Sequence, residues 1–314
     1  MNYNYVRGFN YQPSYGSSGL ELWRKFDADT IRIEVGRGKK YFPKINAVRF
    51  WLSWEAFIRE PEIFSRNFEA ALVIFAEFGL QVMPVLFNRW HDNVLDYGGV
   101  YMDHFMPGNW AYREDLFDRY VSEIVGQHHN DPRIFMWDLC NEPCPWGLQN
   151  PDYAAAVKYE YAWLARVRCL AQEVGATAPL TIGAFVTLDQ LRHWEPLSDV
   201  LSIHPYGMAS FSPPEKWEPL LDECVTFARE KGKPLLATET CWGALDDDRR
   251  VEMIHYTLDQ LKKRDIGWLA YVLHHSLVAD AHRPEFGPVG GPGNLAFIDA
   301  DGTLRPGHEV FNNY

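Results

Sequence analysis

Short apolar runs alternate along the chain with longer amphipathic stretches. The amphipathic stretches repeat their apolar positions every three or four residues, as a helix does, whereas the short runs are typical of buried strands. Eight runs are predicted to be strands: 6–10, 47–52, 81–87, 134–139, 180–184, 200–203, 234–238 and 268–273. Strands and helices in alternation predict a parallel sheet with crossover helices, and eight repeats predict one α/β domain, a (β/α)8 TIM barrel spanning residues 1–314.

The connections between these runs differ in regularity. Helical periodicity is clearest at 68–78, 153–174 and 249–263. The first crossover, 30–44, contains Gly36, Gly38 and Pro43, so a distorted helix is expected there. Long connections at 88–111 and 276–294 follow the third and eighth strands, and the first of them is expected to overhang a functional site, because long loops in compact domains are commonly functional.

Two glutamates each follow one of the apolar runs. Glu142 comes after the fourth run, in Asn141-Glu142-Pro143, and Glu239 comes after the seventh. A barrel of eight units in about 250 residues has roughly 31 residues per unit, so three units take about 94. The observed separation is 97 residues. The spacing therefore predicts that both carboxyl groups lie at the same end of the barrel, facing each other across its mouth.

Two facing carboxyl groups suggest glycoside hydrolysis. That reaction needs one protonated acid to give a proton to the leaving oxygen and one carboxylate to attack or stabilise the anomeric carbon. Arg49, at the end of the second run, is placed to keep Glu239 ionised, while crowding by that carboxylate and partial burial would keep Glu142 protonated. Glu142 is thus predicted to be the acid/base and Glu239 the nucleophile, about 5–5.5 Å apart as retention of configuration requires.

Composition narrows the possible partners. The chain has 314 residues, 47% of them hydrophobic, which is enough for one large core, and its formal net charge is −12. It has no basic cluster interleaved with aromatic residues, so we expect neither nucleic acid nor an anionic membrane as a partner, and a neutral carbohydrate fits better. The most apolar segment, 70–87, is too interrupted to span a membrane.

Cysteine usage and the first residues bear on location. The five cysteines are an odd set without C-x-x-C spacing, which argues against a disulfide framework and a structural zinc site. The segment that starts at Met1 lacks the basic and apolar regions of a secretory signal. Both observations predict a cytoplasmic protein with reduced thiols. Oligomeric state cannot be predicted from these features.

Three segments resemble a known group of enzymes. Trp137-Asp-Leu-Cys-Asn-Glu-Pro143, Asn46-Ala-Val-Arg-Phe50 and Ala237-Thr-Glu-Thr240 look like strands four, two and seven of the clan A retaining glycoside hydrolases. The resemblance is closest to glycoside hydrolase family 5, of the cellulase and mannanase type. It implies a retaining β-glycosidase that acts on oligosaccharides or glycosides by double displacement and needs no cofactor and no metal.

The resemblance also implies roles for individual residues. Asn141 would donate a hydrogen bond to the sugar 2-hydroxyl, and Arg49 would contact the nucleophile. In Ile203-His-Pro-Tyr-Gly207, Tyr206 matches the family's tyrosine beside the nucleophile and His204 matches its histidine on the sixth strand.

One departure concerns the sugar-stacking tryptophan. The family usually has a tryptophan at the end of the eighth strand, but here Trp268 opens that strand and its end reads Val272-Leu-His-His-Ser276. Other aromatic residues that follow strand ends could supply the stacking face, since aromatic rings pack well against sugar C–H groups. The further candidates for sugar contacts are Trp90, His91, Trp146, Trp242 and His275.

Each assignment has an alternative. Glu142 could begin a polar loop, Glu239 could be a rim residue paired with a lysine, Arg49 could be a structural ion-pair partner, and His204 could be a core histidine. Burying Glu239 at the end of an apolar strand without a function would be costly, which favours catalysis.

Two other functions use the same architecture. A metal-dependent TIM-barrel hydrolase could place a divalent ion among Glu142, Glu239, His204, His274 and His275, although the amidohydrolase pattern of His-x-His on the first strand is missing. A non-catalytic glycan-binding barrel is the third possibility, and the presence of both glutamates together with Arg49 and Asn141 argues against it.

Overall fold

Eight parallel strands close into a barrel in sequence order, β1 to β8. The computed structural model describes residues 2–90, 99–145, 147–279 and 294–314. The strands are β1 Arg7–Tyr11, β2 Ala47–Trp51, β3 Gln81–Asn88, β4 Trp137–Asn141, β5 Leu180–Phe185, β6 Leu201–His204, β7 Leu235–Ala237 and β8 Gly267–Ala270. Pairing of β1 with β8 closes the barrel. The predicted (β/α)8 barrel is confirmed.

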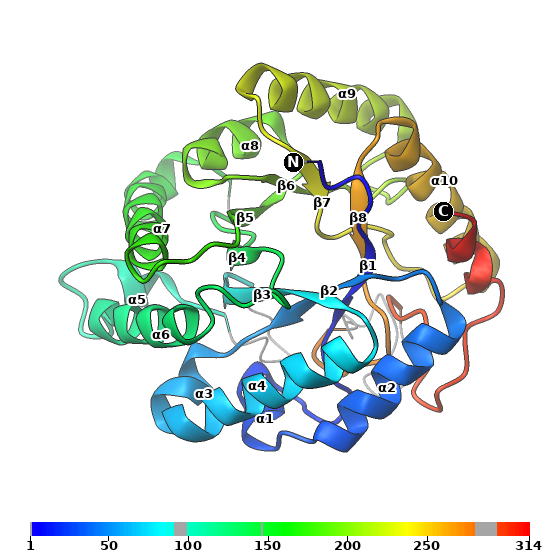
Figure 1. Ribbon diagram of the computed structural model, residues 1–314. Coiled ribbons are helices and arrows are strands. Elements are labelled where there is room, and N and C mark those ends of the chain that lie inside the picture. Colours follow the sequence, from blue (N-terminus) through cyan, green and yellow to red (C-terminus); the bar gives the residue numbers. More distant parts are fainter. Residues whose placement is uncertain (1, 91–98, 146, 280–293) are drawn as a thin grey trace.

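Helices surround the barrel on all sides (Figure 1). The described α-helices are α1 Gly19–Arg24, α2 Ala28–Tyr41, α3 Trp54–Arg59, α4 Pro61–Glu77, α5 Met102–Phe105, α6 Glu114–Gln127, α7 Ala154–Glu173, α8 Leu188–Trp194, α9 Pro214–Lys231 and α10 Asp247–Lys263. Short 3-10 helices lie at Pro151–Tyr153, Glu195–Leu197 and His308–Asn313. None of the helices in the described part of the chain is long and apolar enough to cross a bilayer.

The barrel interior changes character along its axis. Where the strands begin, apolar side chains fill it, among them Val6, Met83, Leu236 and Leu269. Farther along, the buried inward positions are polar and charged: Asn10, Arg49, Asp138, Thr181, Ser202 and Thr238. A larger apolar cluster between the strands and the helices holds the rest of the core. The apolar end stabilises the fold, and the polar end is where chemistry can occur.

The prediction of a distorted first crossover helix is wrong. α2 runs without interruption from Ala28 to Tyr41, and Asp27 caps its start by accepting hydrogen bonds from two backbone N–H groups. Its glycines serve packing instead of bending. A Cβ atom at Gly38 would lie 2.9 Å from a methyl group of Leu273, so only glycine lets the helix approach the barrel this closely.

The fourth and eighth strands are displaced from their predicted positions. β4 begins at Trp137 instead of residue 134, and its pairing with β5 shifts register between Asp138 and Asn141. β8 ends at Ala270 instead of residue 273. Beyond it the backbone N–H groups of Val272 and His275 donate to the carbonyls of Leu295 and Ile298, while the Leu273 N–H donates to the carbonyl of Asn10 on β1, so residues 272–275 lie between β1 and the segment 295–298.

Candidate active site

A pocket of about 550 Å³ opens at the carboxyl ends of the strands, a size typical of small-molecule sites. Its walls come from the ends of most strands and the loops that follow them. The described lining residues include Gln12, Trp51, Asn88, Trp90, Asn141, Glu142, Phe185, His204, Tyr206, Glu239, Trp242 and Tyr271. Both predicted catalytic glutamates therefore lie in one pocket, as do five of the nine other predicted site residues: Trp90, Asn141, His204, Tyr206 and Trp242.

Glu142 is held by the backbone irregularity at the end of β4. The register shift turns both Asp138 and Asn141 toward the barrel axis, although they are three positions apart and regular alternation would place them on opposite faces. Glu142 follows with φ +45°, in the left-handed region that non-glycine residues rarely adopt, and its N–H donates to the carbonyl of Gly183 at 2.7 Å. Surrounding contacts must hold a backbone conformation of this kind in place, and such conformations cluster at functional sites.

The two carboxylate oxygens of Glu142 contact different groups. The Oε1 atom lies 2.6 Å from Nδ1 of His204, and Oε2 accepts a hydrogen bond from the indole N–H of Trp90. Burial raises the pKa of Glu142 to about 7, and the Asp138 carboxylate adds to this, while the Trp90 N–H and Arg49 lower it. The sequence predicted that burial and a neighbouring carboxylate would raise the pKa of Glu142. The neighbouring carboxylate that does so is Asp138 and not Glu239. At neutral pH a large share of Glu142 therefore carries its proton.

Glu239 has a different environment, two residues after β7. Its Oε1 accepts from the Arg49 guanidinium, and its Oε2 accepts from the Tyr206 hydroxyl at 2.5 Å. Burial raises the pKa of Tyr206 well above its ordinary value, and the Glu239 charge adds to this, so the hydroxyl keeps its proton and acts as the donor. A guanidinium and a hydroxyl donor thus hold the two oxygens of Glu239 in a fixed orientation.

The two glutamates face each other with His204 between them. The His204 Nδ1 atom that contacts Glu142 also lies 3.5 Å from Oε2 of Glu239. One oxygen of Glu142 and one oxygen of Glu239 lie within 4.8 Å of each other. An inverting enzyme needs roughly 6.5–9.5 Å between its carboxyl groups to hold a water, so this separation fits the retaining arrangement.

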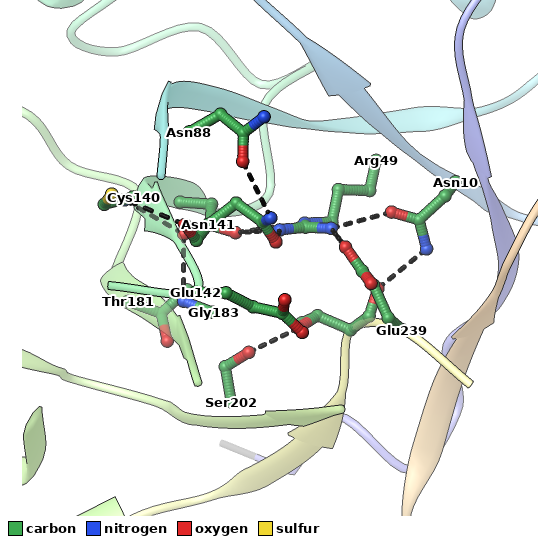
Figure 2. A network of polar contacts seen from close by, with 12 residues as sticks. Asn10, Arg49, Asn88, Cys140, Asn141, Glu142, Thr181, Gly183, Ser202 and Glu239 are labelled. Atoms are coloured by element: carbon green, nitrogen blue, oxygen red, sulfur yellow. Dashed lines mark hydrogen bonds and ion pairs between the residues drawn. The ribbon is translucent and has the colours of Figure 1, made fainter. Parts of the chain in front are cut away.

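Arg49 lies between Asn141 and Glu239 and donates to both (Figure 2). It is completely buried. Besides Glu239, it donates to Asp138 Oδ2 from Nη2 at 2.7 Å and to the side-chain oxygens of Asn10 and Asn141 at 2.8 Å. Burial lowers the pKa of Arg49, but Asp138 and Glu239 outweigh that effect and raise it above its ordinary value. The guanidinium is thus a fixed cation.

Asp138 was not predicted. Its Oδ1 accepts from the backbone N–H groups of Cys140 at 3.2 Å and Gly183 at 3.0 Å, and its Oδ2 accepts from Arg49. A Cβ atom at position 183 would lie 2.9 Å from Asp138 and 3.0 Å from Arg49, so glycine on β5 leaves room for this ion pair. An acidic residue inside an apolar strand four residues before Glu142 was the available sequence signal.

Asn141 belongs to the same network. Its side-chain oxygen accepts from Arg49, and its amide donates to Asn88 Oδ1 at 3.0 Å. The amide orientation is fixed by these two contacts, because Arg49 can only donate. Asn141 therefore presents a rigid polar group to the pocket beside Glu142.

The predicted aromatic and histidine contacts fall into three groups. Trp90 and Trp242 line the pocket, and the Trp242 ring packs edge-on against Tyr206 at 5.1 Å. His91 and Trp146 lie outside the described residues. His275 is misplaced in the prediction: it is buried outside the pocket, because β8 ends five residues earlier. Tyr271, directly after β8, takes the position at the pocket wall that was looked for farther along the chain.

The site could also offer ligands to a cation. Glu142, His204 and Glu239 place three donor atoms within 4.8 Å of one another. His274, predicted as a further ligand, lies elsewhere, with Nε2 3.1 Å from the Arg37 guanidinium. The permanent positive charge of Arg49 on Glu239 opposes a second cation at this position.

Residues 39–276 match the family described as cellulase, glycosyl hydrolase family 5. One stretch of 100 residues is 28% identical to mannan endo-1,4-β-mannosidase A of Podospora anserina, and it covers 26% of this chain and 26% of that protein.

Solved structures show the same architecture. An exo-β-1,4-mannosidase of Opitutaceae bacterium strain TAV5 superimposes with a TM-score of 0.75 at 20% identity over 98% of this chain, which spans 58% of that protein. A hyperthermostable endo-1,4-β-D-mannanase of Thermotoga petrophila RKU-1 gives a TM-score of 0.65 at 15% identity, covering 98% of both chains.

Proposed function

Because the chain belongs to glycosyl hydrolase family 5, we propose that it hydrolyses β-glycosidic bonds with retention of configuration, using Glu239 as nucleophile and Glu142 as acid/base. The observation that carries the proposal is the pair of buried glutamates whose oxygens lie within 4.8 Å of each other but whose contacts differ. One is bonded to a guanidinium and a phenol, and the other has its pKa raised to about 7.

In the first step Glu239 attacks the anomeric carbon while Glu142 gives its proton to the leaving oxygen. As the Glu239 charge passes into the new ester bond, Arg49 and Tyr206 keep the carboxylate oriented. The Glu142 carboxylate that forms is stabilised by the Trp90 N–H.

In the second step the ionised Glu142 takes a proton from water, which attacks the anomeric carbon from the side that the leaving group vacated. His204 is buried, and burial lowers its pKa to about 4, so it stays neutral and does not compete for this proton at neutral pH. In this proposal Asn141, whose side chain contacts Arg49 and Asn88, binds the sugar 2-hydroxyl.

For the sugar we propose β-mannose. The support is the activity named for three relatives, a mannan endo-mannosidase, an exo-mannosidase and a mannanase. The choice between internal and terminal cleavage depends on loops that include residues 91–98 and 280–293, which lie outside the described part of the chain. A cytoplasmic location, in keeping with five unpaired cysteines, stays a prediction.

The test is a panel of nitrophenyl glycosides and defined oligosaccharides, run with the wild type and with Glu239→Gln. We expect the β-mannoside to be hydrolysed best and the variant to lose at least about 10³-fold in kcat. Equal turnover by both proteins would remove Glu239 as nucleophile. Loss of activity on chelation of divalent ions would favour the metal-dependent alternative, and sugar binding without any turnover would favour a glycan-binding barrel.

A further inference from the structure

The pocket has two unlike walls. Polar side chains that can bind sugar hydroxyls, Gln12, Asn88 and Asn141, line it at the ends of β1, β3 and β4. Apolar side chains line it after β5 and after β6: Phe185, Val186, Phe211, Trp217 and Leu220. We propose that this apolar wall binds the leaving group, and that the preferred substrate is a β-glycoside of a hydrophobic alcohol instead of a second sugar. The inference rests on the proposed function.

The apolar wall lies across the mouth from Gln12 and beside Asn141. In a closed barrel of eight strands in sequence order, β5 lies across from β1, whereas β4 pairs directly with β5. A sugar ring held by these polar side chains therefore has the apolar wall next to it, on the side of Glu142.

The proton donor lies where these two walls meet. Glu142 follows β4, which pairs with β5. The Trp90 indole donates to Glu142 and packs edge-on against Phe185, with the ring centres 6.0 Å apart. A leaving oxygen within reach of the Glu142 proton thus has the Phe185 side of the pocket directly beyond it.

The composition of this wall favours a hydrophobic group over a sugar. A sugar leaving group needs hydrogen bonds for several hydroxyls, and leaving them unmade in a pocket is costly. Among the described residues here, Thr187 already caps α8 through its hydroxyl, the Ser212 hydroxyl donates to the Tyr206 carbonyl, and the Lys216 side chain is exposed to solvent. Val186 and Leu220 are aliphatic and, unlike the rings of Phe185, Phe211 and Trp217, offer no flat face on which a sugar stacks.

Phe211 provides an additional observation. Its side chain is 62% exposed at the pocket mouth, and its ring packs edge-on against Trp242 at 5.5 Å. A hydrophobic leaving group would cover this ring and remove its apolar surface from water, which is favourable in proportion to the area buried. Phe211 continues the wall formed by Val186 and Leu220 outward to solvent.

The experiment compares ethyl and hexyl glycosides of the sugar selected by the nitrophenyl panel, together with its β-1,4-linked disaccharide. The two alcohols have the same acidity, so a difference in kcat/KM reports contact with the alkyl chain. Each buried methylene favours binding by up to about fourfold, so we expect hexyl to exceed ethyl by about tenfold or more and to exceed the disaccharide. A hexyl-to-ethyl ratio below fivefold, or a better disaccharide, overturns the inference.

Substitutions in the apolar wall test whether the hexyl-to-ethyl ratio depends on that wall. In Val186→Asn and Leu220→Asn we expect the hexyl-to-ethyl ratio to fall toward one, whereas the control Val73→Asn, at a position 42% exposed on α4, keeps the wild-type ratio. An unchanged ratio in both wall variants would overturn the assignment. If a variant fails to fold, the wild-type series still decides. If none of the glycosides is hydrolysed, the proposed function is wrong, and the inference that rests on it is wrong too.

Discussion

His204 and Glu142 touch through Nδ1 and Oε1 at 2.6 Å, and burial shifts their pKa values in opposite directions. The pKa of His204 falls to about 4 and that of Glu142 rises to about 7, because burial disfavours the charged form of each. In water the imidazole would hold a proton more strongly than the carboxyl group. Here the order is reversed, so between these two values the shared proton resides on the carboxylic acid, where the first catalytic step needs it.

The first prediction concerns the pH dependence of activity. The acid must be protonated, so kcat/KM is expected to fall as pH rises through about 7. The Trp90 N–H lowers the pKa of Glu142, and Trp90→Phe removes that donor while keeping an aromatic ring. The alkaline limb of the profile should therefore move to higher pH. In the control Trp110→Phe, at a side chain 87% exposed, the limb should stay in place, and an unmoved limb in Trp90→Phe contradicts the prediction.

The second prediction concerns stability. Between the ordinary pKa of 4.5 and about 7, folded Glu142 binds a proton that the unfolded chain releases, so its contribution to stability is lost as pH rises. Glu142→Gln cannot ionise. The unfolding free energy of the variant minus that of the wild type should therefore rise by at most roughly 2–3 kcal/mol from pH 5 to pH 8. Urea denaturation at both pH values measures this, and an equal difference at both would speak against a buried, protonated Glu142.

The third prediction concerns Asp138. Replacing it with alanine leaves the buried Arg49 with one carboxylate partner fewer and removes an acceptor for two backbone N–H groups, which should cost about 3–5 kcal/mol of stability. Glu77→Ala removes one of the two carboxylate partners of the exposed Arg32 and should cost at most about 1 kcal/mol. Denaturant unfolding of both variants is the check. Similar small losses would mean that the Asp138 pair does not support the site.

The fourth prediction concerns Tyr206. Tyr206→Phe removes the hydroxyl that donates to Glu239, a charge-assisted hydrogen bond, and should lower kcat by about 10- to 10²-fold. The matched control is Tyr256→Phe, which removes another tyrosine-to-glutamate hydrogen bond, to Glu218, and neither of these residues lines the pocket. Steady-state kinetics on the best glycoside distinguish the two. The same kcat in both variants would exclude a role for Tyr206 at the nucleophile.

Much of the fold could be predicted because a (β/α)8 barrel repeats one strand–helix unit eight times. The spacing of Glu142 and Glu239 gave the barrel geometry, and the structure places both in one pocket with Arg49, His204 and Tyr206. That part of the site depends on which strand each residue follows, and strand order is visible in the apolar periodicity.

The remaining features depend on contacts between segments far apart in sequence. Asp138 faces inward together with Asn141 only because the ladder shifts register between them, and an alternating pattern cannot show that shift. His275 does not line the pocket, because its N–H pairs with Ile298 of the segment 295–298, whereas Tyr271, directly after β8, lines the pocket. Gly38 suggested a distorted helix, but its actual role is a close approach to Leu273.

The most direct measurement of the two roles is the configuration of the glycosyl azide formed when azide rescues alanine variants. With Glu239→Ala, azide replaces the nucleophile and attacks from the opposite face, so the account predicts the α-azide. With Glu142→Ala, azide replaces water in the second step, so the account predicts the β-azide. The reverse pair of configurations, read from the one-bond C1–H1 NMR coupling of the azide, would contradict the assignment of Glu239 as nucleophile and Glu142 as acid/base.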